Sequence, residues 1–169
     1  MKTLILMRHG KSSWDDASLA DFERPLAPRG IKAAKRIGRE LVARGWLPAR
    51  AFVSPSVRTQ ETWRLLASEL PRKPETVSIE TLYDATSDEV LAELHGAAES
   101  DDTLLVIGHN PGLRDVAVAL ASNRSDAKAL ARLNEKFPTA AVARFVFEGK
   151  WPALSQARLT HCLWPKDLG

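Results

Sequence analysis

Two short stretches in which every residue is apolar, at positions 4–7 and 104–107, constrain the fold of this chain more than any other feature. A strand without polar alternation is typical of a parallel sheet that is covered on both faces. Both stretches end abruptly in polar residues, with Arg8-His9-Gly10 after the first and Gly108-His109-Asn110 after the second. The strands of a parallel sheet finish at one edge, where α/β folds bind their ligands. The sequence therefore predicts that His9 and His109 share that edge.

Helical and extended patterns alternate along the rest of the chain. Apolar residues at helical spacing, with a proline suited to the first turn and a glycine after the last, predict a helix over residues 28–44. Further helices are predicted over residues 57–70, 86–98, 113–121 and 127–133, and further strands over 51–53, 77–79, 140–147 and 157–164. Residues 11–24 are polar and predict a loop. This order predicts an α/β fold, a three-layer sandwich with a mainly parallel central sheet and helices on both faces, formed by residues 1–169 as one domain.

Composition excludes several classes of function. The only cysteine, Cys162, rules out an internal disulfide and is compatible with a reducing compartment. The first residues lack the pattern of a signal peptide, and no apolar run approaches the roughly 20 residues of a membrane span. The four histidines lack zinc-type spacing, and the formal net charge of +3 comes without a nucleic-acid-binding module. We therefore expect a cytoplasmic protein with no metal site and no membrane or nucleic-acid partner, and the sequence predicts no particular oligomeric state.

A third basic side chain belongs to the same predicted edge. Arg58 lies in the first turn of the helix that follows the strand at residues 51–53. Together with Arg8 and the two histidines, and with helix N-termini nearby, it predicts a strong anion site. The planar arginine forks match the oxygens of a phosphoryl group. A neutral imidazole in such a cluster can also act as a nucleophile.

Three segments of the chain resemble the motifs of one enzyme superfamily. Arg8-His9-Gly10 after the first strand, the run Ser-Pro-Ser-Val-Arg-Thr-Gln-Glu-Thr at residues 54–62, and Gly108-His109 are similar to the signatures of the histidine phosphatase (phosphoglycerate mutase-like) superfamily. The short chain, and Arg24-Pro25-Leu26 ahead of Arg29-Gly30, resemble the SixA-type phosphohistidine phosphatases within it. The resemblance extends nearly from end to end and implies a phosphoglycerate mutase-like fold.

The resemblance also implies a two-step displacement without a cofactor. His9 attacks phosphorus to give a phosphohistidine enzyme, and water then releases phosphate. Arg8, Arg58 and His109 hold the non-bridging oxygens and stabilise the charge of the transition state. Because His9 must be neutral at the attacking nitrogen, its other nitrogen is expected to donate to a backbone carbonyl or a similar acceptor.

The sequence offers two candidates for the general acid. Family enzymes often carry a carboxylic acid two residues after the leucine that follows the third strand, and counting from Leu82 gives Asp84. Glu80 is the alternative, and a surface charge at the end of a strand explains it equally simply. Asp84 could likewise be a loop residue ahead of the helix that Thr86 caps.

The resemblance suggests further substrate contacts at Ser12, Arg24 and Asn110. Ser12 and Asp15 occupy positions where mutases contact phosphate or substrate, but an aspartate replaces the mutase asparagine and opposes a bound anion. Arg24 has an alternative role in a salt bridge with Asp21 or Glu23, and loop exposure explains Asn110 as well as a contact does. The stretch between Arg58 and His109 is short and leaves little room for a lid. An open cleft suits a phosphoryl group presented by another protein.

Three functions follow, in order of preference. The first is hydrolysis of phosphohistidine in a phosphorylated protein partner, for example a histidine-phosphorylated signalling domain. The second is a phosphatase or mutase for a small phosphorylated metabolite; Asp15 and the absent lid argue against the mutase. The third is a phosphate-binding protein that has lost turnover. It is the weakest, because a binder needs cations but has no use for a nucleophilic histidine at position 9.

Overall fold

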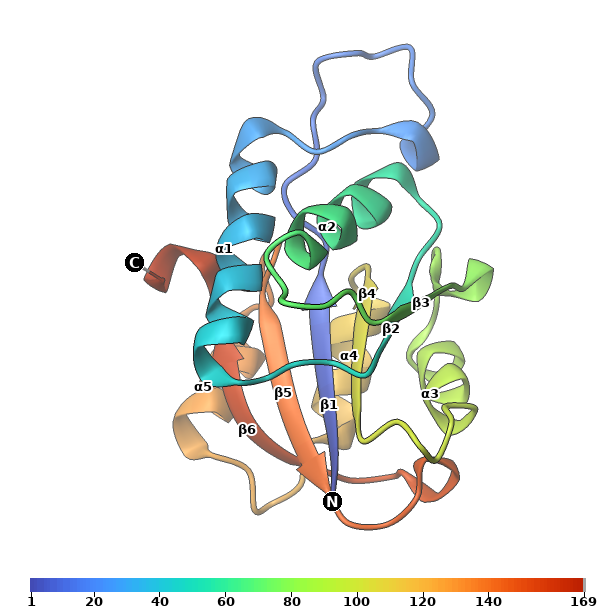
Figure 1. Ribbon diagram of the computed structural model, residues 1–169, viewed down its shortest axis with the longest axis vertical. Coiled ribbons are helices and arrows are strands. Elements are labelled where there is room, and N and C mark those ends of the chain that lie inside the picture. Colours follow the sequence, from blue (N-terminus) through green and yellow to red (C-terminus); the bar gives the residue numbers. More distant parts are fainter. Residues whose placement is uncertain (169) are drawn as a thin grey trace.

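A six-stranded sheet forms the centre of the molecule in the computed structural model, which describes residues 1–168 (Figure 1). The strands are β1 (Lys2–Arg8), β2 (Arg50–Val53), β3 (Glu75–Ser78), β4 (Thr103–Gly108), β5 (Val142–Phe147) and β6 (Arg158–Leu163), in the spatial order β3-β2-β4-β1-β5-β6. β1, β4, β2 and β3 pair in parallel, whereas β5 runs antiparallel to both β1 and β6. The predicted, mainly parallel sheet is therefore confirmed, with one reversed strand.

Five α-helices cover the two faces of this sheet, as predicted. They are α1 (Pro28–Arg44), α2 (Val57–Ala67), α3 (Ser87–His95), α4 (Gly112–Leu120) and α5 (Ala127–Glu135). Single 3-10 turns lie at Asp21–Glu23 (η1), Glu80–Leu82 (η2), Trp151–Ala153 (η3) and Pro165–Asp167 (η4). The predicted helix over 57–70 ends three residues early, because Glu69 and Leu70 donate to carbonyls three residues back in a tighter turn.

The runs of four apolar residues in β1 and β4 are explained by a separate hydrophobic core on each face of the sheet. Leu4 and Leu6 of β1 join the core beneath α3, α4 and α5, whereas Ile5 and Met7 join the core beneath α1 and α2. Successive side chains of a strand point to opposite faces, so a strand buried on both sides must be apolar at every position. These four residues of β1 have no exposed surface. The three-layer sandwich follows from this double burial.

The register of the parallel strands brings the predicted polar ends together. Arg8 pairs with Gly108, and Val53 pairs with Ile107. One residue further on, the backbone N–H of His9 donates to the Gly108 carbonyl oxygen at 3.1 Å. The backbone N–H of Ser54 donates to the Ile107 carbonyl oxygen, also at 3.1 Å. Three adjacent strands therefore leave the sheet at the same level.

The segment from residue 10 to residue 27 rises from this edge as a long projection before entering α1 (Figure 1). Its two limbs pair at the base, where Ser13 N–H donates to the Pro25 carbonyl and Ala27 N–H donates to the Lys11 carbonyl, each at 2.8 Å. The first turn of α1 then packs directly on the end of β1. A Cβ at Gly30 would lie 2.3 Å from the Lys11 carbonyl oxygen, so only glycine allows this approach.

Candidate active site

The imidazole of His9 lies at the carboxyl end of β1 and is nearly fully buried. Its Nδ1 is 2.7 Å from the carbonyl oxygen of Gly10. A carbonyl can only accept, so Nδ1 carries the proton and Nε2 keeps a lone pair that accepts from Nε of Arg58 at 3.4 Å. Burial lowers the pKa of His9 to about 3, although the Gly10 carbonyl opposes this, and the neighbouring His109, Arg58 and Arg8 lower it further. The ring is therefore neutral at physiological pH.

His109 faces His9 from the end of β4, with the two ring centroids 5.2 Å apart. Its Nδ1 is 3.5 Å from Nη2 of Arg58, and its Nε2 is 2.7 Å from Oγ of Ser54. Since a guanidinium only donates, Nδ1 accepts and Nε2 donates its proton to the serine hydroxyl. Burial, and then the nearby Arg58, lower the pKa of His109 to about 4, with Asp21 acting in the opposite direction. Both imidazoles are thus neutral in the absence of an anion.

Arg58 presents two edges of its buried guanidinium to different groups. Nε lies 3.4 Å from Nε2 of His9, and Nη2 lies toward Nδ1 of His109, so one edge faces the gap between the two histidines. The other edge is held by Asp21: Nη1 donates to its backbone carbonyl at 2.7 Å and Nη2 donates to its carboxylate at 2.9 Å. The edge that faces the histidines can bind two oxygens of a phosphoryl group.

Asp21 and Tyr83 form the outer wall of this cluster. The hydroxyl of Tyr83 donates to the Asp21 carboxylate at 2.6 Å, and the tyrosine ring meets the edge of the His109 ring at 5.4 Å between centroids. The hydrogen bond from Tyr83, followed by the Arg58 contact, lowers the pKa of Asp21 to about 2, and the carboxylate raises the pKa of Tyr83. Asp21 therefore carries no proton at neutral pH and is unsuited to general acid catalysis.

The start of α2 fixes Arg58 in place. The side chain of Ser56 caps the helix by accepting from the Thr59 N–H. The hydroxyl of Thr62 accepts from the Gly10 N–H at 3.0 Å and donates to the Arg58 carbonyl at 2.7 Å. This buried bridge ties the turn after His9 to the helix that carries the arginine. The polar residues of the segment 54–62 thus hold the backbone as well as the ligand-facing side chain.

Arg8 and Asn110 meet at one backbone group on the opposite side. Nη1 of Arg8 and Nδ2 of Asn110 both donate to the Phe137 carbonyl oxygen, at 3.3 Å and 2.8 Å. The Asn110 Oδ1 atom is buried and has no hydrogen-bond partner among the described residues. Burial, with the nearby Arg58, lowers the pKa of Arg8, but an arginine remains charged. The structure therefore groups Arg8, His9, Arg58 and His109, with Asn110 beside Arg8.

The two acid candidates lie on the segment that passes beside His109. Asp84 follows Tyr83 directly, is exposed, and has a φ of 57°, a conformation that aspartate tolerates. The next residue packs against the start of α4, because a Cβ at Gly112 would lie 2.1 Å from the Ala85 carbonyl oxygen. Glu80 is exposed in η2, two residues before the buried Leu82. Of the two candidates, Asp84 is therefore the one whose neighbour in the sequence, Tyr83, contacts His109.

Arg24 and Ser12 support the projection above the site. The Arg24 side chain is buried, lies 3.5 Å from the centre of the Trp14 ring, and forms an ion pair of 3.4 Å with Asp21. The ion pair is the structural role that the sequence left open for Arg24, and contact with a substrate stays a prediction. Ser12 is buried at the base of the projection, where its backbone pairs with Leu26.

Sequence reasoning missed Asp21, Tyr83, Ser54 and Thr62 as parts of the site. Ser54 had the same signal as the histidines, because it follows a strand that ends at the ligand edge. Asp21 had none, since its contact depends on the path of a segment without periodicity. The site is less open than the sequence predicts, because η1 covers Arg58. This short cover does not come from the stretch between Arg58 and His109.

The residues that the structure describes contain neither a cluster of metal-ligating side chains nor a membrane-spanning helix. No three His, Cys, Asp or Glu side chains among residues 1–168 gather in a way that could hold a metal ion. Within the same residues, no helix is long and apolar enough to cross a membrane.

Comparisons with known proteins show which family this chain resembles. A model of the histidine phosphatase superfamily (branch 1) matches residues 4–85. An uncharacterised protein of Mycobacterium tuberculosis (strain H37Rv) is 36% identical over 152 residues, which cover 86% of this chain and 89% of that protein. The relationship therefore extends well beyond the matched segment.

Solved structures resemble this chain over nearly its whole length. A candidate phosphohistidine phosphatase SixA from Nakamurella multipartitia superposes with a TM-score of 0.81 at 29% identity, over 97% of this chain and 96% of that one. The protein histidine phosphatase SixA complexed with tungstate has a TM-score of 0.80 at 21% identity, over 98% of each chain, which shows a shared fold.

Proposed function

This chain belongs to the histidine phosphatase superfamily, in its SixA-type branch, and from that membership we propose that it hydrolyses phosphohistidine in a partner protein through a phosphorylated His9. The observation that supports this most directly is the state of His9. Its Nδ1 proton is engaged by the Gly10 carbonyl, and its Nε2 lone pair faces the inner edge of Arg58. A neutral, oriented imidazole beside fixed cations is the arrangement that nucleophilic attack on a phosphoryl group needs.

In the first proposed step, Nε2 of His9 forms a bond to phosphorus while the bond from phosphorus to the substrate nitrogen breaks. The substrate imidazole already carries a proton on its other ring nitrogen, so it departs as a neutral ring that keeps this proton. In the second step, a water oxygen bonds to phosphorus, the bond to His9 breaks, and the water gives up a proton, so that phosphate leaves and the imidazole is restored. Arg8 and Arg58 supply fixed positive charge throughout. An anion beside Nδ1 of His109 favours protonation there, which turns this atom into a donor.

Exposed apolar side chains on the projection support a macromolecular substrate. Trp14 is 70% exposed, and Leu19 and Phe22 are each 36% exposed. Phe22 also contacts Tyr83 edge-on at 5.1 Å between ring centroids, which places it on the wall of the candidate site. Large apolar groups that remain exposed next to a charged cleft are typical of a surface that contacts another protein.

The test compares turnover of a phosphohistidine protein, an aryl phosphate and a panel of metabolite phosphates. Wild-type protein should turn over the phosphohistidine protein with the highest kcat/KM, retain activity in a chelator, and yield phosphorylated His9 after rapid quenching in alkali and mass spectrometry. His9→Ala should be inactive and folded. His161→Ala, which changes a histidine of β6 outside this cluster, should be fully active. Phosphate release by His9→Ala at the wild-type rate would end the proposal, and higher kcat/KM on a metabolite would move it to small-molecule hydrolysis.

A further inference from the structure

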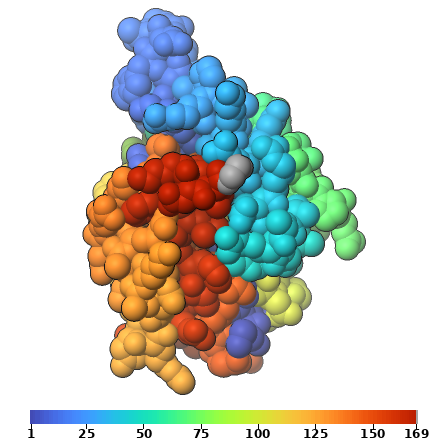
Figure 2. Space-filling model, turned by 90° about the vertical axis from the view of Figure 1, so that its left-hand side faces the viewer, coloured from blue at the N-terminus to red at the C-terminus, as the bar shows by residue number. Residues whose placement is uncertain are grey.

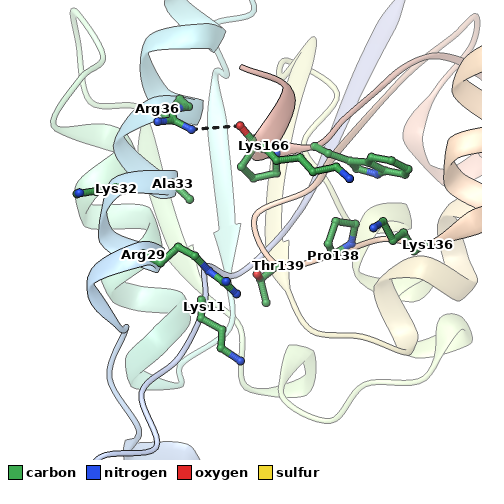
Figure 3. Close-up of a pocket in the computed structure, with 11 residues that line it drawn as sticks. Lys11, Arg29, Lys32, Ala33, Arg36, Lys136, Pro138, Thr139 and Lys166 are labelled. Carbon is green, nitrogen blue, oxygen red and sulfur yellow. Dashed lines mark hydrogen bonds between the residues drawn. The ribbon is translucent and has the colours of Figure 1, made fainter. Parts of the chain in front are cut away.

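A second hollow opens on the flank of the molecule, between α1 and the two chain segments at residues 136–139 and 164–166 (Figure 3). It has a volume of about 450 Å³. On the corresponding face of the molecule, the C-terminal segment lies against α1 (Figure 2). None of its lining residues belongs to the candidate active site.

Six cations and no carboxylate line this hollow. They are Lys11, Arg29, Lys32, Arg36, Lys136 and Lys166. None of the six is within 4.0 Å of an acidic group among residues 1–168. The whole chain has a formal charge of +3, so the residues outside this set sum to −3 (+3 minus +6). Six of the 24 Lys and Arg side chains therefore line one concavity that has no carboxylate in its lining, and their mutual repulsion is relieved when an anion binds.

The cations belong to separate walls, which indicates an extended ligand. Arg29, Lys32 and Arg36 line the hollow from α1, and Lys136 and Lys166 line it from the opposite wall. Arg29 and Arg36 extend toward that wall, whereas the Lys32 ammonium lies on the outer side of α1 (Figure 3). Arg29 points across the hollow toward Thr139 (Figure 3). A single phosphate would meet only part of this set, whereas a chain that carries several carboxylates can meet both walls.

The aromatic residue in the hollow does not offer a stacking surface. Trp164 is 7% exposed, and its ring is covered by the Arg132 guanidinium at 4.1 Å, by Lys136 at 4.9 Å and by Lys166 at 5.2 Å. A nucleotide base would find no free aromatic face. The tryptophan instead holds two of the lining lysines through cation–π contacts. The ligand is accordingly recognised by charge.

The hollow is directly connected to the candidate active site through the backbone. Lys11 lies two residues after His9. On the opposite wall, Thr139 precedes Ala140, whose N–H donates to the His9 carbonyl oxygen at 2.9 Å. Phe137, between the lining residues Lys136 and Pro138, accepts from Arg8. A polypeptide whose phosphorylated residue enters the site can therefore reach this hollow with a neighbouring segment.

We propose that this hollow binds a carboxylate-rich segment of the phosphorylated protein substrate. The proposal rests on the proposed function and specifies the chemistry of its partner. The concentration of cations that have no ion pair within residues 1–168 supplies attraction over several residues, and the shared backbone supplies proximity to His9. Binding here raises the affinity for the protein substrate without taking part in the chemical step.

A binding experiment tests the hollow without any turnover. The probe is a fluorescent peptide rich in Asp and Glu, measured by anisotropy at low salt with the full chain. Arg29→Gln/Lys32→Gln/Lys136→Gln removes three lining cations, and Lys35→Gln/Lys73→Gln/Lys128→Gln removes the same charge elsewhere. The first variant should weaken peptide binding about tenfold and the second by less than about twofold, since exposed charge pairs each contribute modestly and locally. Equal weakening by both variants would show a response to net charge and overturn the proposal. So would tripolyphosphate binding in the hollow without peptide binding.

A kinetic experiment connects the hollow to the substrate. With a phosphohistidine protein that carries an acidic segment, the lining variant should raise KM about tenfold and leave kcat unchanged, as expected for contacts made equally in the ground and transition states. Its turnover of an aryl phosphate should equal that of the wild type. An unchanged KM for the protein substrate would overturn the docking role. If no phosphohistidine protein is turned over but the peptide still binds in the hollow, the proposed function fails and the acid-binding site stands.

Discussion

Asp21 shows how one residue can determine which part of a neighbour is available. Its carbonyl and carboxylate hold the outer edge of the Arg58 guanidinium, so the inner edge is aimed at the gap between the two histidines. An arginine that is fixed in this way loses less freedom when it binds a phosphoryl group. Asp21 is therefore a positioning residue that acts through Arg58.

Asp21→Ala should lower kcat about tenfold, which is less than the roughly 10²- to 10³-fold loss for removing a charge-stabilising donor such as Arg58. Asp21→Asn keeps an oxygen for Arg58 and Tyr83 and should recover most of the rate. Steady-state kinetics with an aryl phosphate measure both variants. Equal losses in the two variants would show that the charge of Asp21, and not its hold on the arginine, is what matters.

Asp84 can be tested through the chemistry of the leaving group. A general acid contributes roughly 10²- to 10⁴-fold, and its contribution rises with the basicity of the departing atom. An alkoxide needs a proton as it leaves, whereas an imidazole with a pKa of about 6.5 can leave already protonated. Asp84→Asn should therefore slow alkyl phosphate hydrolysis much more than phosphohistidine hydrolysis. Equal slowing of both substrates would contradict the acid role, and Glu80→Gln is the comparison that detects the alternative acid.

At the scale of elements, the contact between α1 and the end of β1 couples stability to the site. Ala at position 30 would place a Cβ 2.3 Å from the Lys11 carbonyl oxygen and 2.8 Å from its nitrogen, so the helix must shift away from the turn after His9. Gly30→Ala should lower the free energy of unfolding by about 1–3 kcal/mol, the usual cost of overpacking, and should reduce turnover as well. Gly96→Ala is the matched control, because its Cβ would meet its nearest neighbour at an ordinary 3.5 Å. Urea unfolding curves with the same midpoint for both variants would refute this.

The elements also show where sequence reasoning succeeds. The double-sided burial of β1 and β4 is encoded locally, in runs of apolar residues, so both strands and the edge at which they end were predictable. The register then brought His9 and His109 together without further information. The cover over Arg58 was not predictable, because η1 is a single turn in a segment with no periodic pattern, and its position depends on the ion pair of Arg24 and the hydrogen bond from Tyr83. Sheet geometry thus led to both histidines, although Ser54 at the same edge was overlooked, whereas Asp21 and Tyr83 were missed because loop contacts fix them.

For the whole molecule, the buried His9 and the half-buried His109 should make stability dependent on pH. The pKa values of His9 and His109 are about 3 and about 4 in the folded protein, compared with an ordinary value of about 6.5. Between these values the unfolded chain binds protons that the folded chain does not, so the free energy of unfolding falls as the pH is lowered from about 6.5. The slope is at most about 1.4 kcal/mol per pH unit for each histidine.

Urea unfolding between about pH 6.5 and pH 5, above the range in which most carboxylates titrate, measures this slope. His109→Gln removes one of the two groups and should reduce the slope, while His95→Gln, on α3 and outside the cluster, should not. An identical slope in wild type and His109→Gln would be inconsistent with a histidine held neutral at that position.

The position of β1 in the sheet has a consequence for how this protein is made. β1 leaves the ribosome before the other strands of this sheet, yet both of its neighbours, β4 and β5, are translated only from Thr103 and Val142 onward. Until then its apolar residues have no partner strand on either side, and His9 has no His109 to face. Most of the chain must therefore emerge before the strand ends that carry the candidate site can come together. During this interval the apolar run at residues 4–7 lacks its partner strands, and it is the part of the chain that chaperones have most reason to bind.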